Sequence, residues 1–342
     1  MIKYLIPDGG NFYKTALHCH STVSDGKLTP EELKTEYKRL GFSAVAFTDH
    51  ELIVPHPELE DRDFIPITSY EIATNERGNP WPQTKTYHLN LYFRDKNTTL
   101  SKTLCTRKVF AREHMQALIT DEMRAIGTED RYYTKEFIQW IVDTAKEEGA
   151  LVSYNHPVWS LQNKDDYSGI KGFFGVEWHN SSCIRIGMPD SINPIDDLIR
   201  EGEKMCFPLA TDDCHQLCEV GLGWVQVKAP SLTYENIFDA LERGDFYSSE
   251  GPEIKELFVE DGNLHIKTSD VVKIVMFNDT RRVPYKNAPE GEFINEAVFP
   301  LADFLENARN AKEGHISYLR VDVMDASGKY ARTRAYFVNE LT

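Results

Sequence analysis

Two short motifs in this sequence each contain two residues of types that can bind metals, with one other residue between them. One pair is His18 and His20, and the other is Asp213 and His215. Each pair follows a short run of β-forming residues, and the side chains of an extended chain alternate between its two faces. Both members of a pair therefore share a face and can reach the same ion. Taken alone, such a pair is also found in ordinary protein cores and surfaces.

Further histidines and carboxylates accompany other predicted strands. We expect short strands at 43–48, 65–69, 87–93, 151–154, 175–178 and 207–211. At or after the ends of these strands lie His50, Glu71, His88 and His156. In barrels of alternating strands and helices, residues far apart in sequence converge at the carboxyl ends of the strands. So many buried imidazoles and carboxylates would be costly without cations, and divalent transition metals suit this ligand set.

The elements that must position these residues alternate between strand and helix in the first part of the chain. Thr29 and Glu32 form a capping box that predicts the start of one helix. Residues 99–133 are an insertion whose apolar residues recur at helical spacing, which predicts a helix over the barrel mouth. The later sequence becomes β-rich. We therefore expect a metal-binding body at 1–250 and a small β-rich domain at 251–342.

The content and order of the motifs resemble the PHP (polymerase and histidinol phosphatase) family. The residues that carry this resemblance are His18-x-His20, Ser24-Asp25-Gly26, Thr48-Asp49-His50, Glu71, His88, Asn155-His156-Pro157 and Asp213-x-His215. The likeness covers roughly residues 13–250, and the tail that begins at Gly244 is similar to the CehA/McbA group of metallohydrolases. The resemblance implies an α/β fold, namely a distorted (β/α)7 barrel with a trinuclear metal centre, followed by a small C-terminal β-rich domain.

The resemblance also implies which residues hold each metal. The three sites would be formed by His18, His20, Glu71 and Asp213, by Glu71, His88 and His156, and by Asp25, His50 and His215. Glu71 would thus bridge two metals, and Asp25 stands where some family members have histidine. We expect Glu71, Asp213 and His215 to take part in catalysis. Imidazole and carboxylate ligands suit two or three zinc, manganese or iron ions.

Four other residues are candidates for contact with the substrate. Glu177 and His179 share one face of a predicted strand and could reach the metal cluster. Arg107 and Arg112 lie in the insertion and could bind a phosphate through their guanidinium groups. The alternatives are a structural role for the first two and a solvated helix face for the arginines.

The predicted centre is consistent with three functions. The leading hypothesis is a phosphoesterase, in which a metal-bridging hydroxide attacks phosphorus while the metals neutralise the phosphoryl oxygens. The same centre could instead hydrolyse a carbamate, an amide or a carboxylic ester. Basic residues at the mouth would favour phosphate, whereas an apolar mouth with Trp81, Trp159 or Trp178 would favour a neutral aryl substrate. A non-catalytic, metal-stabilised binding module is the third hypothesis.

Composition narrows the class of partner. The 342-residue chain has a formal net charge of -16, which argues against a protein that grips an extended nucleic-acid backbone. No apolar run approaches the length of a membrane span, and the first ten residues do not form a secretory signal. Six cysteines without paired spacing do not indicate a disulfide scaffold. We therefore expect a soluble, cytoplasmic enzyme that acts on a small molecule, most simply a phosphate ester.

Overall fold

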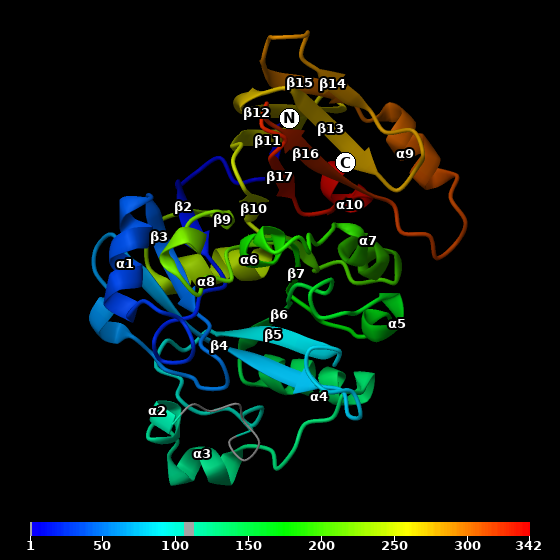
Figure 1. Ribbon diagram of the computed structural model, residues 1–342. Helices are drawn as coiled ribbons and strands as arrows, with labels where there is room; N and C mark the ends of the chain where they lie inside the picture. The colour runs from blue at the N-terminus through cyan, green and yellow to red at the C-terminus, as the bar shows by residue number, and fades with distance from the viewer. Residues whose placement is uncertain (1, 106–112) are drawn as a thin grey trace.

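The computed structural model describes residues 2–105 and 113–342 as a mixed α/β protein with two sheets (Figure 1). Eight neighbouring strands of the larger sheet come from residues 11–229. In spatial order they are β9 (Trp224–Ala229), β2 (Asn11–Ala16), β3 (Phe42–Phe47), β4 (Ile65–Asn75), β5 (Thr86–Phe93), β6 (Ala150–Tyr154), β7 (Gly175–Asn180) and β8 (Phe207–Thr211). The expected mixed α/β class is confirmed.

The strands of this sheet do not all run in one direction. Strands β2, β3 and β4 are parallel to one another, as are β6, β7 and β8, but β5 is antiparallel to both of its neighbours. Among the described residues, no ladder joins β8 to β9 or β2 and closes a barrel. Past the strand ends the two sides are joined, because Cys19 bridges Cys214 and His20 N donates to the Cys214 carbonyl. The expected (β/α)7 barrel is thus only partly formed by strand pairing.

Helices cover the outside of this sheet. The capping box predicted at Thr29 and Glu32 starts α1 (Pro30–Arg39), with each residue's side chain accepting from the other's backbone N–H. Outside the insertion, the other helical segments of this part are α4 (Lys135–Glu147), α5 (Lys164–Tyr167), α6 (Ser181–Arg185), α7 (Asn193–Arg200), α8 (Tyr234–Arg243), η1 (Pro57–Leu59) and η2 (Leu217–Glu219). Among the described helices, none is long and apolar enough to cross a bilayer.

The insertion differs from the single helix that its apolar spacing predicts. Its described part contains two short helices, α2 (Glu113–Gln116) and α3 (Asp121–Ile126). Thr120 caps α3 with its side chain and so starts a new helix where we expected the first to continue. Met115, Ile119 and Met123 are buried in the core that α4 covers, whereas Leu118 is exposed. The insertion also reaches the site region, where His114 Nε2 lies 3.2 Å from the Val23 carbonyl.

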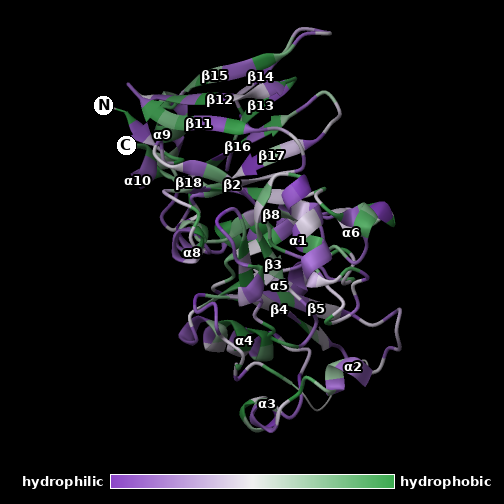
Figure 2. Cartoon of the chain, turned by 90° about the vertical axis from the view of Figure 1, so that its left-hand side faces the viewer, coloured by the Kyte–Doolittle hydropathy of each residue, from purple (hydrophilic) through white to green (hydrophobic). Residues whose placement is uncertain are grey.

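The C-terminal unit is β-rich, as expected, but it is continuous with the larger sheet. Its strands are β10 (Phe246–Ser249), β11 (Ile254–Glu260), β12 (Asn263–Val271), β13 (Lys273–Asn278), β14 (Tyr285–Asn287), β15 (Ile294–Pro300), β16 (Tyr318–Met324), β17 (Tyr330–Thr333) and β18 (Tyr336–Phe337), and its helices are α9 (Ala302–Arg309) and α10 (Val338–Leu341). Strand β10 pairs with both β9 and β17, so one sheet runs through both parts. Figure 2 shows hydrophilic and hydrophobic residues alternating along β11, β12 and β15.

The first residues of the chain belong with this C-terminal unit. Strand β1 (Lys3–Tyr4) pairs antiparallel with β11 in a separate four-stranded sheet. Leu5 and Ile6 are buried in the core cluster of the C-terminal strands. In space, the β-rich unit thus includes both ends of the described chain, which lie close together in Figure 1. A division at residue 250 alone does not capture this arrangement.

Candidate metal centre

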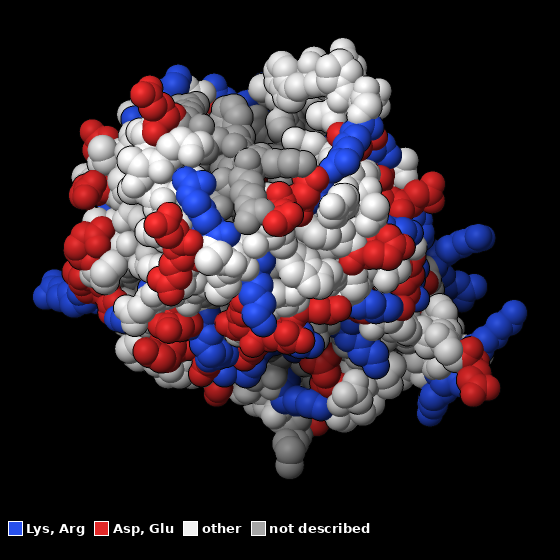
Figure 3. Space-filling model, turned by 90° about the horizontal axis from the view of Figure 1, so that it is seen from below, with Lys and Arg blue, Asp and Glu red and all other residues white. Residues whose placement is uncertain are grey.

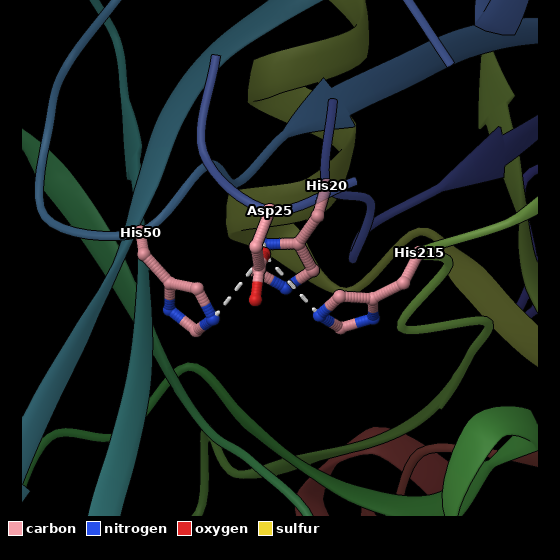
Figure 4. A group of neighbouring side chains, drawn as sticks. All are labelled: His20, Asp25, His50 and His215. Carbon is pink, nitrogen blue, oxygen red and sulfur yellow. Dashed lines mark ion pairs between the residues drawn. The ribbon is translucent and has the colours of Figure 1, made fainter. Parts of the chain in front are cut away.

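All nine residues proposed as metal ligands lie together at one end of the larger sheet. Four groups of possible ligand atoms lie there, each with all atoms within 4.8 Å of one another. Three contain only proposed ligands, namely His20, Asp25, His50 and His215; His18, His20 and Asp213; and Glu71, His88 and His156, while the fourth joins Glu177 to His18 and His156. Figure 4 shows the first group, in which the side chains of His50 and His215 point towards Asp25 from opposite sides. Their Nε2 atoms lie 3.8 Å and 3.5 Å from Asp25 Oδ1.

The strand directions explain how Glu71 and His88 reach this end. We expected both residues after their strands, but Glu71 lies within β4 and His88 lies near the start of β5. Because β5 is antiparallel to β4, its first residues lie beside the last residues of β4, and His88 pairs with Ala73. An antiparallel strand can therefore supply a ligand to this edge only from its beginning.

Two carboxylates lie at the centre of the cluster. Glu71 Oε1 lies 3.1 Å from His88 Nδ1 and 3.3 Å from His18 Nε2, and its Oε2 lies 3.0 Å from His50 Nδ1. Asp213 Oδ1 lies 3.3 Å from the same His18 nitrogen. Both carboxylates are buried. Each ion pair that the structure gives to either of them, within the described residues, is to a histidine.

The protonation of this cluster is divided between its members. Burial opposes charge on Glu71 and Asp213, but the surrounding imidazoles outweigh it and hold the pKa of both carboxyls well below the usual value. Burial also opposes charge on His50 and His156, but neighbouring carboxylates raise their pKa to about 9. Burial and two neighbouring histidines lower the pKa of His20 to about 4. Such a cluster exchanges protons for cations readily, because metal ligands must be deprotonated.

Two further observations fit a metal at this place. The buried Nδ1 of His20 has no hydrogen-bond partner, although it faces the group around Asp25. His156 and Asp213 have positive φ angles of 26° and 52°, which residues other than glycine rarely adopt. Backbone strain of this kind is concentrated at functional sites. The donor set and the geometry therefore fit divalent transition metals.

Glu177 lies behind the ligands rather than among substrate contacts. Its Oε1 lies 2.7 Å from His18 Nδ1 and accepts from Thr211 Oγ1 at 2.8 Å. Its Oε2 accepts from His156 N at 3.0 Å and from Asn180 Nδ2 at 2.9 Å. All of these contacts are buried. A carboxylate on Nδ1 fixes the tautomer of His18 and directs its Nε2 towards the cluster.

His179, another candidate for substrate contact, lies away from the cluster. The ladder between β7 and β8 shifts between Glu177 and His179, so simple strand alternation fails there. His179 instead contacts Ser181 Oγ at 3.0 Å and Glu250 Oε2 at 3.1 Å, at the junction with the C-terminal unit. Arg107 and Arg112 lie outside the described residues.

Asp49 and Asp212 hold loops next to the cluster. Asp49 accepts from Ser21 N at 2.8 Å and Ser24 Oγ at 2.7 Å, so it holds the loop that carries Asp25. Asp212 accepts from the backbone N–H groups of residues 221–223, each at 2.7 Å.

A cavity of about 730 Å³ adjoins the cluster. Three predicted ligands, Asp25, His50 and His88, form part of its lining, and Trp81 and Trp159 form another part. The Trp159 ring centroid lies 5.3 Å from that of His88 and 5.1 Å from that of His156. The cavity is therefore a place where a substrate could reach the cluster.

Comparison with known proteins supports the family resemblance. Residues 16–105 match the sequence model of the PHP domain. This segment is similar to a PHP domain. Six of the nine proposed ligands lie in the matched PHP segment, namely His18, His20, Asp25, His50, Glu71 and His88. The match, together with the geometry of the cluster, supports a metal-dependent hydrolase.

One curated relative matches part of the chain. A 5'-3' exoribonuclease of Haemophilus influenzae is 31% identical over 123 residues, which are 35% of this chain and 43% of the relative. The chain thus matches less than half the length of that enzyme.

Two solved structures are similar to this chain in their arrangement. One is a two-domain protein from Bacteroides vulgatus containing a predicted PHP-like metal-dependent phosphoesterase, with 15% identity, 98% of each chain covered and a TM-score of 0.45. The other is the lesion-specific endonuclease PfuEndoQ from Pyrococcus furiosus, with 18% identity, 68% of this chain and 56% of that chain covered, and a TM-score of 0.38. Neither likeness is close enough to assign an activity to this chain.

Proposed function

We propose that this protein is a metal-dependent phosphoesterase. The observation that carries the proposal is the pair of buried carboxylates, Glu71 and Asp213, whose described ion pairs are all to histidines. A buried carboxylate needs a compensating charge, and imidazoles supply one only while they are protonated. Divalent cations would neutralise both carboxylates with the histidines in their neutral, metal-binding form. The PHP domain match supports the same chemistry.

We assign three metals to ligand sets that follow the family resemblance. The proposed sets are His18, His20, Glu71 and Asp213; Glu71, His88 and His156; and Asp25, His50 and His215. When bound, such metals lower the pKa of water and neutralise the oxygens of a phosphoryl group. Glu71 contributes to two sets, so it fixes their spacing. Glu177 holds His18 in the orientation that the first set needs.

The proposed substrate is a small phosphate ester. The acidic net charge of -16 opposes long contacts with nucleic-acid backbones. Figure 3 shows acidic and basic side chains interspersed over the face of the molecule that it draws. The alternative substrate is a phosphoester at the end of a nucleic-acid strand, because the relative from Haemophilus influenzae is named an exoribonuclease.

A second candidate function is hydrolysis of a neutral aryl carbamate, amide or ester at the same centre. One observation favours it: Trp81 and Trp159 line the cavity beside the cluster, while no Lys or Arg is found in its lining within the part of the chain that the structure describes. The metals would then be the main source of positive charge. Trp178 does not contribute, because its Nε1 donates to Ser248 Oγ at the junction with the C-terminal unit.

The test combines metal analysis with a substrate screen of the full chain. We expect the protein, expressed in metal-supplemented medium, to carry about two or more transition-metal ions. It should hydrolyse phosphomonoesters or phosphodiesters, lose this activity with a chelator, and regain it when metal is restored. Hydrolysis of aryl carbamates alone would favour the second candidate. Metal binding without hydrolysis of any of the three substrate classes would favour a binding module, and less than one ion per chain would contradict the metal centre.

A further inference from the structure

We propose that the cavity beside the cluster binds a flat aromatic group of the substrate, and that Trp159 and Trp81 determine this specificity. The proposal deepens the proposed function, on which it depends for the scissile ester bond. It does not depend on which metal is bound.

The cavity connects the cluster to an apolar wall. Its lining includes the proposed ligands His50 and His88. The same lining includes the apolar side chains Trp81, Trp159 and Leu161. Its volume of about 730 Å³ lies within the ordinary range of small-molecule sites. A ligand can therefore fill the apolar part while its ester group lies at the cluster.

Trp159 is placed to stack a ring close to the reacting bond. Its ring centroid lies 5.3 Å from that of His88 and 5.1 Å from that of His156, both of which are proposed ligands. The side chain is only partly buried, so it is not simply a core residue. An aromatic group on the free face of Trp159 would lie next to the metal sites.

The loop that carries Trp159 is fixed before any ligand binds. Ser160 N donates to the His156 carbonyl at 3.1 Å, and Thr86 N donates to the Ser160 carbonyl at 3.3 Å. Val158 N donates to Asp190 Oδ1 at 2.9 Å. These contacts hold the residues on both sides of Trp159, so little ordering cost remains when a ring stacks on it.

Trp81 forms a solvent-exposed part of the cavity lining. It lies in the loop between β4 and β5 and is 79% exposed, the highest value among the exposed large apolar side chains of the described chain. A large aromatic side chain left in water beside a cavity is typical of a ligand contact, because burying it on binding is favourable. We infer that Trp81 covers the bound aromatic group from the solvent side.

The charges of the lining favour a neutral group in this part of the cavity. Within the described lining, the charged or titratable residues are Asp25, His50, Glu51 and His88. Glu51 is already paired with the buried guanidinium of Arg131. An anionic group would meet carboxylates here rather than cations, so the phosphate belongs at the metals and the aromatic group in the cavity.

The experiment compares two phosphate esters, one with a flat aromatic ring and one with a saturated ring, whose ester bonds have similar reactivity. Benzyl phosphate and cyclohexylmethyl phosphate have similar size and leaving alcohols of similar acidity. With the metal-loaded full chain we expect kcat/KM to favour the benzyl ester by about 10-fold, as expected for one stacked ring. Trp159→Leu and, separately, Trp81→Leu should reduce this ratio towards one. Trp140→Leu, on the remote helix α4, should leave the ratio unchanged.

Binding measured by calorimetry separates this inference from the proposed function. Benzylphosphonate and cyclohexylmethylphosphonate cannot be hydrolysed, so they report affinity alone. Preference for benzylphosphonate that is lost in Trp159→Leu supports the aromatic site even if neither phosphate ester is hydrolysed, in which case only the proposed function fails. Equal affinity for the two phosphonates, no binding of either, or a preference that survives both tryptophan substitutions would overturn the aromatic site, whether or not phosphoesters are hydrolysed.

Discussion

Two buried polar clusters in this protein balance their charges in different ways. At the junction between α7 and the C-terminal unit, the Arg320 guanidinium is paired with Asp196 and donates to Asp322 Oδ1 at 3.0 Å. Arg332 Nη1 donates to Asp322 Oδ2 at 2.6 Å, and the Tyr318 hydroxyl donates to Asp196 at 2.9 Å. Each buried acid there has an arginine. At the other cluster, the described ion-pair partners of Glu71 and Asp213 are all histidines.

This difference distinguishes a structural joint from a binding site. Arginine remains protonated at any ordinary pH, so the junction is neutral and complete without any ligand. Histidine charges change within the physiological range, so the charge of the cluster around Glu71 is not fixed by the chain itself. A set of buried acids that faces only titratable partners can accept added cations. The predictions that follow test this distinction.

The largest effect is expected from Glu71→Gln. Glu71 contacts several proposed ligands through both carboxylate oxygens. Its amide would lack the charge that two neighbouring cations need, so metal content should fall and turnover should drop by about 1,000-fold or more. Elemental analysis and steady-state kinetics on the same preparation check both results.

Glu177→Gln is the matched control, because Glu177 is equally buried but lies behind His18. Its amide should retain most of the metal and slow turnover by about 10- to 100-fold, the usual range for a group that only orients a ligand. If Glu177→Gln strips the metal while Glu71→Gln keeps both metal and activity, the assignment of ligands is wrong.

The second largest effect is expected from a substitution at the junction with the C-terminal unit. It should lower the free energy of unfolding without changing metal content or turnover. Arg320→Met leaves Asp196 buried without its arginine, which typically costs about 3–5 kcal/mol. Denaturant unfolding should show this loss, while metal content and turnover at low temperature should stay near those of the parent protein. Arg243→Met removes an exposed ion pair with Asp245 and should cost less than about 1 kcal/mol. Equal losses in the two variants would contradict a structural role for the Arg320 pairing.

The candidate ligands could be found in the sequence because their types, order and positions near strand ends are local features. The capping box at Thr29 was predictable for the same reason, since it depends on two residues three positions apart. The direction of β5 was not, because neither periodicity nor turn residues specify which neighbour a strand joins. The pairing of Asp196 with Arg320 spans 124 positions and leaves no pattern in the sequence. The place of β1 in the C-terminal sheet is likewise a long-range outcome of packing.

The smallest predicted effect is a difference in how metal stabilisation depends on pH. In the metal-free protein the carboxylates raise the pKa of His50 and His156 to about 9, above the value of about 6.5 for an unfolded chain. Their contribution to stability is therefore complete below about pH 6.5 and is lost as the pH rises towards 9. The low pKa of His20 matters only below this window, because His20 is neutral in both states above about pH 6.5.

Metal binding requires these imidazoles to be neutral, so it strengthens over the same pH window in which the metal-free protein weakens. The gap in melting temperature between manganese-loaded and chelator-treated protein should therefore widen by a few degrees between about pH 6.5 and 9. The loss caused by Arg320→Met should stay constant over this range, because an arginine guanidinium keeps its charge throughout it. Thermal unfolding at several pH values measures both. A gap that stays constant or narrows would mean that protons and metals do not compete at the cluster, and the contrast between the two clusters would then fail.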